Sequence, residues 1–435
     1  MPDAFVIACL LTLITFGLVT GIARRTPIDA LDYWLKGFWE LLEFTMQMAL
    51  ILLTGFMIAT APAVSSVLRA IAKIPKTSRG TVALIALVSM GVSWIHWGLG
   101  LVAAPLFLGF VVREHPDVDY RLAVAAGYLG SACTWHAGLS GSAPLLMATP
   151  NHFLAKEVGI IPMSTTTFSP FNLTLTSVIV ATMTALAVVM CPRTSKNPAQ
   201  SRMSDEPSLD DMSKEGLAAA AAPASRSFAE TLETRYWLNL VMGLLGAAGF
   251  FAVYARHFQV SLNVFNFAFL FLALLLHPNP RSFMRSAAQG TGFLHGIIIQ
   301  FPFYAGMYGL IRYSGLAETI AHGFVSIASP RSFALIVYWY SGVLSYFIPS
   351  GGSKWAVEAP YILAAAKTLG VPPQQAIIAY AWGDMSTHFL QPFWAIPLLT
   401  IAKIDFKDIV GYLAIFFMIN ILIVSAAFLL LPLVW

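Results

Sequence analysis

Apolar segments about as long as a membrane-spanning helix recur along this chain, and they restrict its fold more than any other feature. Their approximate bounds are 4–23, 41–62, 168–191, 237–254, 261–276, 290–312 and 407–432. About 20 residues of helix cross the hydrocarbon core of a bilayer, where the backbone has to satisfy its own hydrogen bonds. Of the 435 residues, 11% are charged, whereas an average soluble domain has about 25%. The sequence therefore predicts an all-α polytopic membrane protein.

Two more apolar segments, 79–112 and 331–366, are each divided by a break that is rich in Gly and Ser. The breaks lie at 93–100 and 349–354. Each half-segment is short for a membrane span, and backbone that is not helical at membrane depth has to be buried in protein or line a wet cavity. We therefore predict two re-entrant hairpins, each of which enters and leaves the membrane on one side.

Segments 121–150 and 373–402 are also interrupted by Gly, Ser and Pro, and we predict that they are broken helices. Together with the uninterrupted segments they make about nine spanning helices. The long polar stretch 192–234 cannot bury enough apolar surface to fold alone, so it is predicted to be a flexible cytoplasmic linker. It separates an N-terminal membrane repeat, 1–191, from a C-terminal one, 235–435.

The two halves resemble each other weakly in sequence. Aligning 79–100 with 331–352 without gaps pairs Arg79 with Arg331, Ser89 with Ser341, Ser93 with Ser345 and Gly100 with Gly352. These identities coincide with both breaks, which indicates an internal repeat with two re-entrant hairpins and two broken helices.

Basic residues predict the orientation of the repeats. The two loops that flank the first hairpin contain Arg69, Lys73, Lys76, Arg79, Arg113 and Arg121. The positive-inside rule places these loops in the cytoplasm. Following the chain in both directions then gives a cytoplasmic N-terminus and a periplasmic C-terminus. The first hairpin enters from the cytoplasm and the second from outside, so the repeats are inverted.

Paired helix breaks in two halves indicate a transporter binding site, because freed carbonyls can hold a cation and free N–H groups can hold an anion. The alternative is that Ser and Gly only allow close helix packing. The candidate substrate-binding residues are Gly98, Gly100, Ser140, Gly141, Ser142, Ser350, Gly351, Gly352, Ser353, Lys354 and Gln391. Trp97, Trp135 and Phe393 are candidates for an apolar wall.

Ionisable residues inside apolar segments are costly and indicate function. Asp384 is the carboxylate next to the second broken-helix interruption, so Asp384, Ser386 and Thr387 are the candidate ion-coupling residues, with a helix cap as the alternative role of Asp384. Lys354 either holds a substrate carboxylate or pairs with Glu358 four residues later.

Metal chemistry is not indicated by the sequence. His96, His136 and His388 lack the spacing of a helical zinc site, and no HExxH motif occurs. The three cysteines have no CxxC spacing. We expect no cofactor apart from a coupling Na⁺ or H⁺. An intramembrane metal-dependent hydrolase that uses these histidines is the alternative of another class.

The chain resembles the bacterial short-chain fatty acid transporters over nearly its whole length. The resemblance rests on six ordered motifs, LTLITF at 11–16, MQMALI at 46–51, GSAPLLMATP at 141–150, QFPFYAG at 300–306, PSGG at 349–352 and QPFWAIP at 391–397. The segment that usually precedes the first helix in this family is missing, which leaves a truncated start open.

The resemblance implies a secondary active transporter rather than an enzyme. It implies symport of short monocarboxylates such as butyrate or acetoacetate with H⁺ or Na⁺ across the bacterial inner membrane. It also implies the inverted-repeat architecture of the wider ion-transporter superfamily, in which elevator-type carriers are often homodimers. The expected partners are a small carboxylate and membrane lipid, with no nucleic acid. A carrier of dicarboxylates or other organic anions and a passive anion channel are the rival functions.

Overall fold

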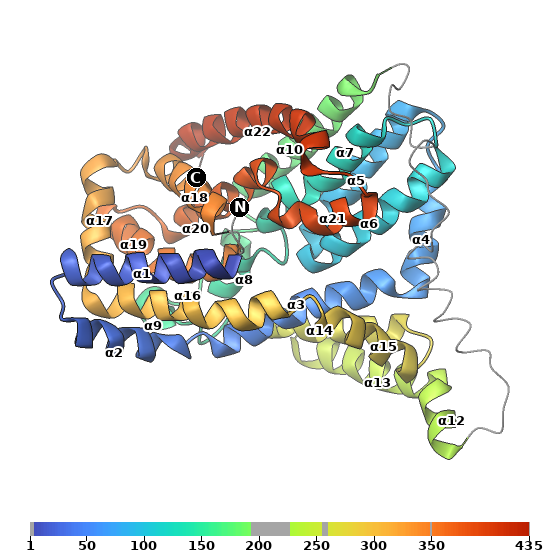
Figure 1. Cartoon of the computed structure of the whole chain (residues 1–435), viewed down its shortest axis with the longest axis horizontal. Helices are drawn as coiled ribbons and strands as arrows, with labels where there is room; N and C mark the ends of the chain where they lie inside the picture. Colours follow the sequence, from blue (N-terminus) through green and yellow to red (C-terminus); the bar gives the residue numbers. More distant parts are fainter. Residues whose placement is uncertain (1–3, 193–226, 255–259, 349, 435) are drawn as a thin grey trace.

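The computed structural model describes residues 4–192, 227–254, 260–348 and 350–434. All regular elements within these ranges are helices, as the apolar segments predict. Up to Cys191 the elements are α1 Ala4–Gly21, α2 Pro27–Phe38, α3 Leu42–Thr60, α4 Pro62–Ala72, α5 Ser78–Ile95, α6 Trp97–Glu114, α7 Tyr120–Cys133, η1 Trp135–Ala137, α8 Ser142–Met147, α9 Ala155–Val158, η2 Met163–Thr165 and α10 Pro170–Met190 (Figure 1).

The second half repeats this order of elements. It contains α12 Phe228–Thr234, α13 Tyr236–Gly249, the π-helical turn η4 Phe250–Tyr254, α14 Leu262–Leu276, α15 Pro280–Thr291, α16 His295–Ser314, α17 Leu316–Ile327, α18 Phe333–Phe347, α19 Gly351–Leu369, α20 Pro373–Ser386, η5 Thr387–Leu390, η6 Phe393–Ala395, α21 Ile396–Ala402 and α22 Phe406–Val434. In both halves a long helix, α3 or α16, is followed by a short helix, a divided helix pair and a broken helix. Most of the predicted linker lies outside the described residues, and its last residues form α12.

Six helices in the described ranges are long and apolar enough to cross a membrane, or seven if α15 and α16 form one bent span. The number of about nine spanning helices is still a prediction, and so is the re-entrant path of the hairpins.

Each predicted hairpin consists of two helices that are separated by a short break. α5 and α6 pack against each other and are divided at His96, whose extended backbone (φ −154°, ψ 107°) ends one helix and precedes the next. The Nδ1 atom of His96 accepts the N–H of Leu99 at 3.2 Å, so this residue also caps α6. α18 and α19 are divided after Phe347, and α19 starts at Gly351 with an extended Ser350 before it.

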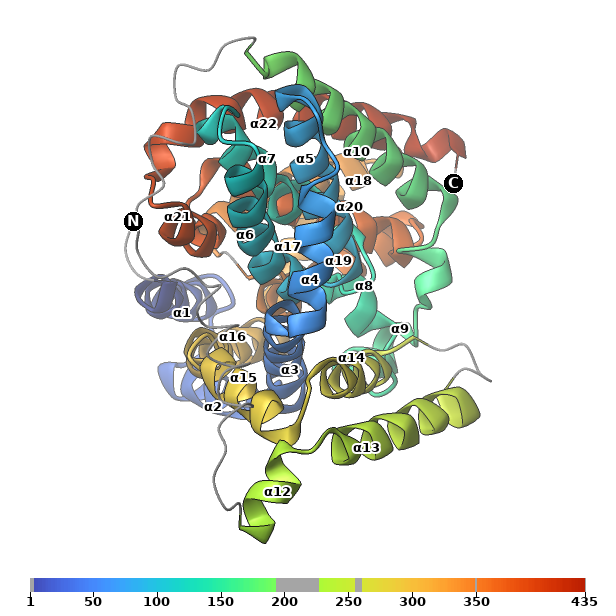
Figure 2. The same cartoon turned by 90° about the vertical axis from the view of Figure 1, so that its right-hand side faces the viewer.

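The packing of the two halves follows the same scheme. α5 packs along α7, as α18 packs along α20, and α3 packs on α6, as α16 packs on α19. Figure 2 shows α10 and α22 on one side of the bundle and α13 and α14 on the other. Trp97, Trp135, Ser350 and His388, one residue from each of the four helix breaks, line the same cavity.

Contacts between loops define two ends of the molecule. At one end Lys73 lies 4.0 Å from Glu114, and Arg121 lies 3.0 Å from Asp408. At the other end the guanidinium of Arg312 pairs with Glu157 at 2.6 Å. The topology predicted from the sequence places the loops next to Lys73, Glu114, Arg121 and Asp408 in the cytoplasm. It places the loops next to Glu157 and Arg312 in the periplasm. Each ion pair therefore joins loops that are predicted to lie on the same side.

Candidate functional site

A cavity lies where the two hairpins and the two broken helices meet. Its wall is mainly aromatic and aliphatic, and the side chains come from both halves: Met48, Trp97, Leu101, Trp135, Ile297, Phe301 and Trp394. The indole rings of Trp97, Trp135 and Trp394 pack edge to face, with Trp97 6.3 Å from Trp135 and 6.2 Å from Trp394. Such a wall suits a short acyl chain, because aromatic faces offer a large rigid apolar surface.

The polar part of the cavity is the beginning of α19. Ser350, Gly351 and Gly352 line the cavity, and Ser350 makes no side-chain hydrogen bond to cap the helix. Instead, the hydroxyl of Ser353 donates to the hydroxyl of Ser350 at 2.6 Å. The first N–H groups of a helix have no partner within the helix and carry the positive end of its dipole. The uncapped α19 terminus therefore offers N–H donors to an anion.

Two other helix beginnings near the cavity are capped by side chains. The N–H of Trp97, the first residue of α6, donates to the hydroxyl of Ser140 at 2.8 Å. The N–H of Ala143, in the first turn of α8, donates to Nε2 of His136 at 3.1 Å. Of these three helix beginnings, α19 is thus the one that remains open to a ligand.

Three cavity residues have buried polar nitrogens without a hydrogen-bond partner in the described part of the chain. They are the indole nitrogens of Trp97 and Trp394 and Nε2 of His388. Buried polar atoms usually have hydrogen-bond partners, so these three nitrogens are available to a ligand in the cavity. An indole N–H can only donate, so the groups of Trp97 and Trp394 suit a ligand that accepts hydrogen bonds.

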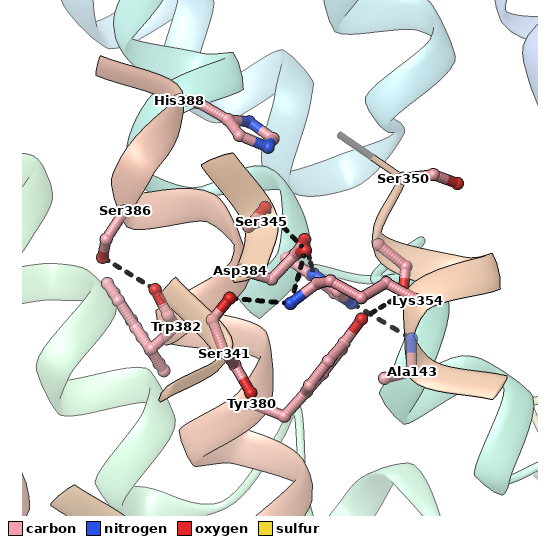
Figure 3. A network of polar contacts seen from close by, with 12 residues as sticks. Ala143, Ser341, Ser345, Ser350, Lys354, Tyr380, Trp382, Asp384, Ser386 and His388 are labelled. Atoms are coloured by element: carbon pink, nitrogen blue, oxygen red, sulfur yellow. Dashed lines mark hydrogen bonds and ion pairs between the residues drawn. The ribbon is translucent and has the colours of Figure 1, made fainter. Parts of the chain in front are cut away.

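A network of buried charges lies next to the cavity (Figure 3). The ammonium of Lys354 is 3.2 Å from Oδ1 of Asp384 and 3.3 Å from Oε1 of Glu358, and it donates to the carbonyl of Ser341 at 2.8 Å. It also lies 4.3 Å from the centre of the Tyr380 ring. All three charged side chains are fully buried. The positive charge of Lys354 is therefore already paired with protein carboxylates.

Hydrogen bonds hold both carboxylates of this network. Oδ2 of Asp384 accepts from Nδ1 of His136 at 2.8 Å, and Oδ1 accepts from the hydroxyl of Ser345 at 3.0 Å. Because Nε2 of His136 accepts the N–H of Ala143, His136 carries its proton on Nδ1 and is neutral. Oε2 of Glu358 accepts from Ser341 at 2.7 Å. With both carboxylates ionised, the network has one positive and two negative charges.

Residues 1–431 match the family model described as "Short chain fatty acid transporter". The chain belongs to this family. A provisionally named short-chain fatty acid transporter of Escherichia coli (strain K12) is 36% identical over 413 residues, which cover 95% of this chain and 92% of that protein. A second one, from Haemophilus influenzae (strain ATCC 51907 / DSM 11121 / KW20 / Rd), is 34% identical over 442 residues, and the match covers 99% of this chain and 96% of that protein. The protein is therefore a membrane transporter and not an enzyme.

Solved structures confirm the fold class of this short-chain fatty acid transporter family member. The YdaH transporter of Alcanivorax borkumensis superposes with a TM-score of 0.62 at 14% identity, over 100% of this chain and 99% of that chain. MtrF of Neisseria gonorrhoeae, described as illuminating a class of antimetabolite efflux pumps, gives a TM-score of 0.54 at 15% identity over 99% and 95%.

Some of the candidate substrate residues of this transporter line the cavity and others have structural roles. Ser142, Ser350, Gly351 and Gly352 line it. Gly98 and Gly100 lie where helices approach closely, since a Cβ on Gly98 would come within 3.0 Å of Leu52 Cα and one on Gly100 within 2.7 Å of Ser93 Cα. Ser140 caps α6, Gly141 precedes α8, Ser353 bonds Ser350, and Lys354 belongs to the charge network.

Gln391 and the aromatic wall differ from the sequence-based picture. The side-chain oxygen of Gln391 accepts the N–H of Phe393 at 3.0 Å, so this residue shapes the turn before η6. Trp97 and Trp135 line the cavity as expected, and the third indole is Trp394 in place of Phe393. The two residues are adjacent, and the turn of η6 decides which one faces inward.

The structure separates two of the candidate ion-coupling residues from Asp384. The hydroxyl of Ser386 donates to the carbonyl of Trp382 at 2.7 Å, and the hydroxyl of Thr387 donates to the carbonyl of Gly342 at 2.9 Å. Figure 3 shows the Ser386 side chain pointing away from the Asp384 carboxylate. Asp384 itself is not a helix cap, because its oxygens bind His136, Ser345 and Lys354.

The three histidines considered for a metal site have different partners. His96 caps α6, His136 binds Asp384, and Nδ1 of His388 lies 2.8 Å from the carbonyl of Ser131. The described residues contain no group of three His, Cys, Asp or Glu side chains that could hold a metal ion. Sequence reasoning considered His388 at a helix break but gave it no role in substrate binding, and it missed Ser131 as a cavity residue. The recurrence of His next to both broken-helix interruptions, at His136 and His388, was the available signal.

Proposed function

We propose that this chain is a secondary active transporter that carries short monocarboxylates, such as butyrate or acetoacetate, across the bacterial inner membrane. The observation that carries the proposal is the cavity, which combines an aromatic wall with the uncapped beginning of α19 at Ser350–Gly352. The wall suits a short acyl chain, and the free N–H groups suit its carboxylate.

The paired state of Lys354 favours a monocarboxylate over a dicarboxylate. A second carboxylate of the substrate needs a second cationic or donor group. Lys354 does not line the cavity, and its ammonium is paired with Asp384 and Glu358. Most other side chains of the wall are apolar or aromatic, and an unpaired charge beside them would be costly.

Transport against a gradient needs a coupled cation, and we propose symport with H⁺ or Na⁺. Asp384 is part of the proposed coupling machinery through the charge network that it shares with Lys354. We also propose that the end with Lys73 and Arg121 is cytoplasmic, because it collects the basic loops, and that the transporter functions as a homodimer.

Uptake of labelled butyrate into proteoliposomes tests this function. Inward gradients of H⁺ and of Na⁺ are imposed in turn, and protein-free liposomes measure the passive entry of butyric acid. The expected result is accumulation above the protein-free level under one gradient, competed by unlabelled acetoacetate. A passive channel would only equilibrate butyrate. Entry at the protein-free level under both gradients would refute the proposal.

A site variant with a matched control links uptake to the cavity. In Gly351→Ala the new Cβ would lie 2.6 Å from Oδ2 of Asp384 and 2.7 Å from the Trp135 ring, so the α19 tip has to move. Gly91 in α5 has no atom within 4 Å of such a Cβ. Butyrate uptake is expected to be lost in Gly351→Ala and kept in Gly91→Ala, at equal amounts of reconstituted protein.

A further inference from the structure

His388 presents a nitrogen without a proton to the cavity. Its Nδ1 atom lies 2.8 Å from the carbonyl of Ser131, and a carbonyl can only accept a hydrogen bond, so Nδ1 carries the hydrogen. Nε2 has no partner among the described residues, although His388 is 1% exposed and lines the cavity. In Figure 3 the ring projects from its helix into the space between η5 and the tip of α19 at Ser350.

A bare ring nitrogen and a carboxylate cannot bind each other directly. Both are acceptors, and their lone pairs repel. A single proton removes the conflict, because the protonated Nε2 then donates to a carboxylate oxygen in a charge-assisted hydrogen bond.

On the basis of the function proposed above, we infer that the coupled ion is a proton that His388 takes up on Nε2 when the substrate carboxylate enters the cavity. The loading step is the binding of one carboxylate and one proton from the same side of the membrane. The new bond is N–H on Nε2, and release on the other side breaks it and returns both ions to solution.

The aromatic rings beside His388 and the carboxylate of Asp384 favour the protonated ring. The ring of Trp135 stacks on it at a centroid distance of 6.0 Å with an angle of 9° between the planes, and the ring of Trp394 lies at 6.4 Å. An aromatic face attracts a cation through its quadrupole. With both of its carboxylates ionised, the network of Lys354, Asp384 and Glu358 adds a net negative charge nearby.

Charge balance also favours joint binding. A carboxylate alone would add a second negative charge to a buried region that already has a net negative charge in the network. Burial of an uncompensated charge is costly. A carboxylate together with a proton adds no net charge, so the loaded and empty transporters carry the same charge as they change conformation.

The ionisable groups around His388 come from every element that packs near it. The hydroxyl of Tyr128 on α7 donates to the backbone carbonyl of His388 at 3.2 Å. Charge interactions reach the ring from Asp384, His136 and Lys354. The remaining ionisable side chains on these elements are Tyr120, Arg121 and Cys133 on α7, Tyr338, Tyr340 and Tyr346 on α18, Tyr380 on α20, and Lys407, Asp408 and Tyr412 towards the beginning of α22. Of these groups Asp384 favours protonation of the ring, whereas His136 and Lys354 oppose it.

Isothermal titration calorimetry of the purified full chain tests the inference. Butyrate is titrated at neutral and alkaline pH in buffers with different heats of ionisation, and the slope of the observed heat against the buffer heat counts the protons taken up. The expected count for the native chain approaches one per bound butyrate. Its butyrate affinity is expected to fall by up to about tenfold per pH unit in the alkaline range, because the complex binds one proton more than the empty protein.

His388→Gln is the decisive variant, because its side-chain amide can donate to a carboxylate without taking up a proton. It is expected to bind butyrate with a proton count near zero and with little dependence on pH. The control is His322→Gln on α17, where the native side chain is exposed, and it is expected to keep the native count. Size-exclusion chromatography checks that both variants are folded.

Each remaining outcome decides against one of the two proposals. A native chain that binds butyrate without proton uptake, or a His388→Gln protein that keeps the native count, overturns the inference and leaves monocarboxylate transport intact. Binding that requires Na⁺ and releases or takes up no proton also overturns it. A native chain that binds no butyrate and fails the uptake assay overturns the proposed function, and the inference with it.

Discussion

Replacing Lys354 by Met should destabilise the protein far more than replacing Glu358 by Met. The reason is the charge count of the buried network. Without Lys354, two ionised carboxylates remain in a fully buried site, whereas without Glu358 one ammonium and one carboxylate remain and balance each other. The two substitutions remove partners of the same ion pair, so a difference between them reports the third charge, Asp384.

The distances set the size of the effect. Lys354 lies 3.2 Å and 3.3 Å from the two carboxylates, and at an effective dielectric constant of about 20 each contact corresponds to about 5 kcal/mol of attraction before desolvation is subtracted. Removing one partner of a buried ion pair typically costs about 3–5 kcal/mol, which we expect for Lys354→Met. Glu358→Met removes one carboxylate and its hydrogen bond from Ser341, but it leaves Lys354 and Asp384 as a neutral pair. We therefore expect a loss of about 1–3 kcal/mol in the free energy of unfolding.

Reversible unfolding in mixed detergent–SDS micelles, followed by tryptophan fluorescence, measures these free energies. Lys367→Met is the matched control, because this exposed lysine lies in the last turn of the same helix, and its effect should stay within about 1 kcal/mol. The double variant Lys354→Met/Glu358→Met should be more stable than Lys354→Met alone. Equal losses for the two single variants, or a larger loss for Glu358→Met, would show that the network does not carry a net negative charge.

Three further predictions follow from the cavity and from the two ends of the molecule. Succinate should compete with labelled butyrate at least tenfold less well than acetoacetate. Its second carboxylate would lie against the aromatic wall without a partner, which corresponds to a loss of about 1.4 kcal/mol or more in binding free energy. Equal competition by the two acids would favour a dicarboxylate carrier. Replacing Ser350 by Ala should leave butyrate uptake within a few-fold of native, because the Ser350 side chain does not cap α19 and the backbone N–H groups remain. Complete loss of uptake would mean that the hydroxyl binds substrate. In a cysteine-free background, an impermeant maleimide should label Lys156→Cys but not Lys76→Cys in intact cells; the opposite pattern would invert the orientation.

The elements around the site could be predicted because each break is a local property of the sequence. Gly and Pro do not favour helix continuation, so the divisions between α5 and α6 and between α18 and α19 are visible in the residues themselves. The repeat was visible as well, since Ser93 and Ser345 occupy equivalent places before the two breaks. The family follows from motifs distributed over the whole chain.

The roles of single residues at these breaks were less predictable. Gly98 and Gly351 both follow a break, yet Gly98 packs against α3 while Gly351 lines the cavity. Lys354 was expected to bind either a substrate or Glu358, and it pairs with Asp384 as well, which lies thirty positions later on another helix. Local spacing reports neighbours within one helix and contains no information about which distant side chain lies opposite.

The sequence by itself determined that the chain is a helical membrane transporter with breaks at matching places in two halves, because hydrocarbon imposes one simple requirement on every backbone that crosses it. The tertiary structure decided which helix beginning stays uncapped, which indole rings face the cavity, and that His388 rather than Lys354 presents an unpaired group there. These features depend on partners brought together from distant positions, since a hydrogen-bonding group is free or occupied only with respect to what surrounds it in space.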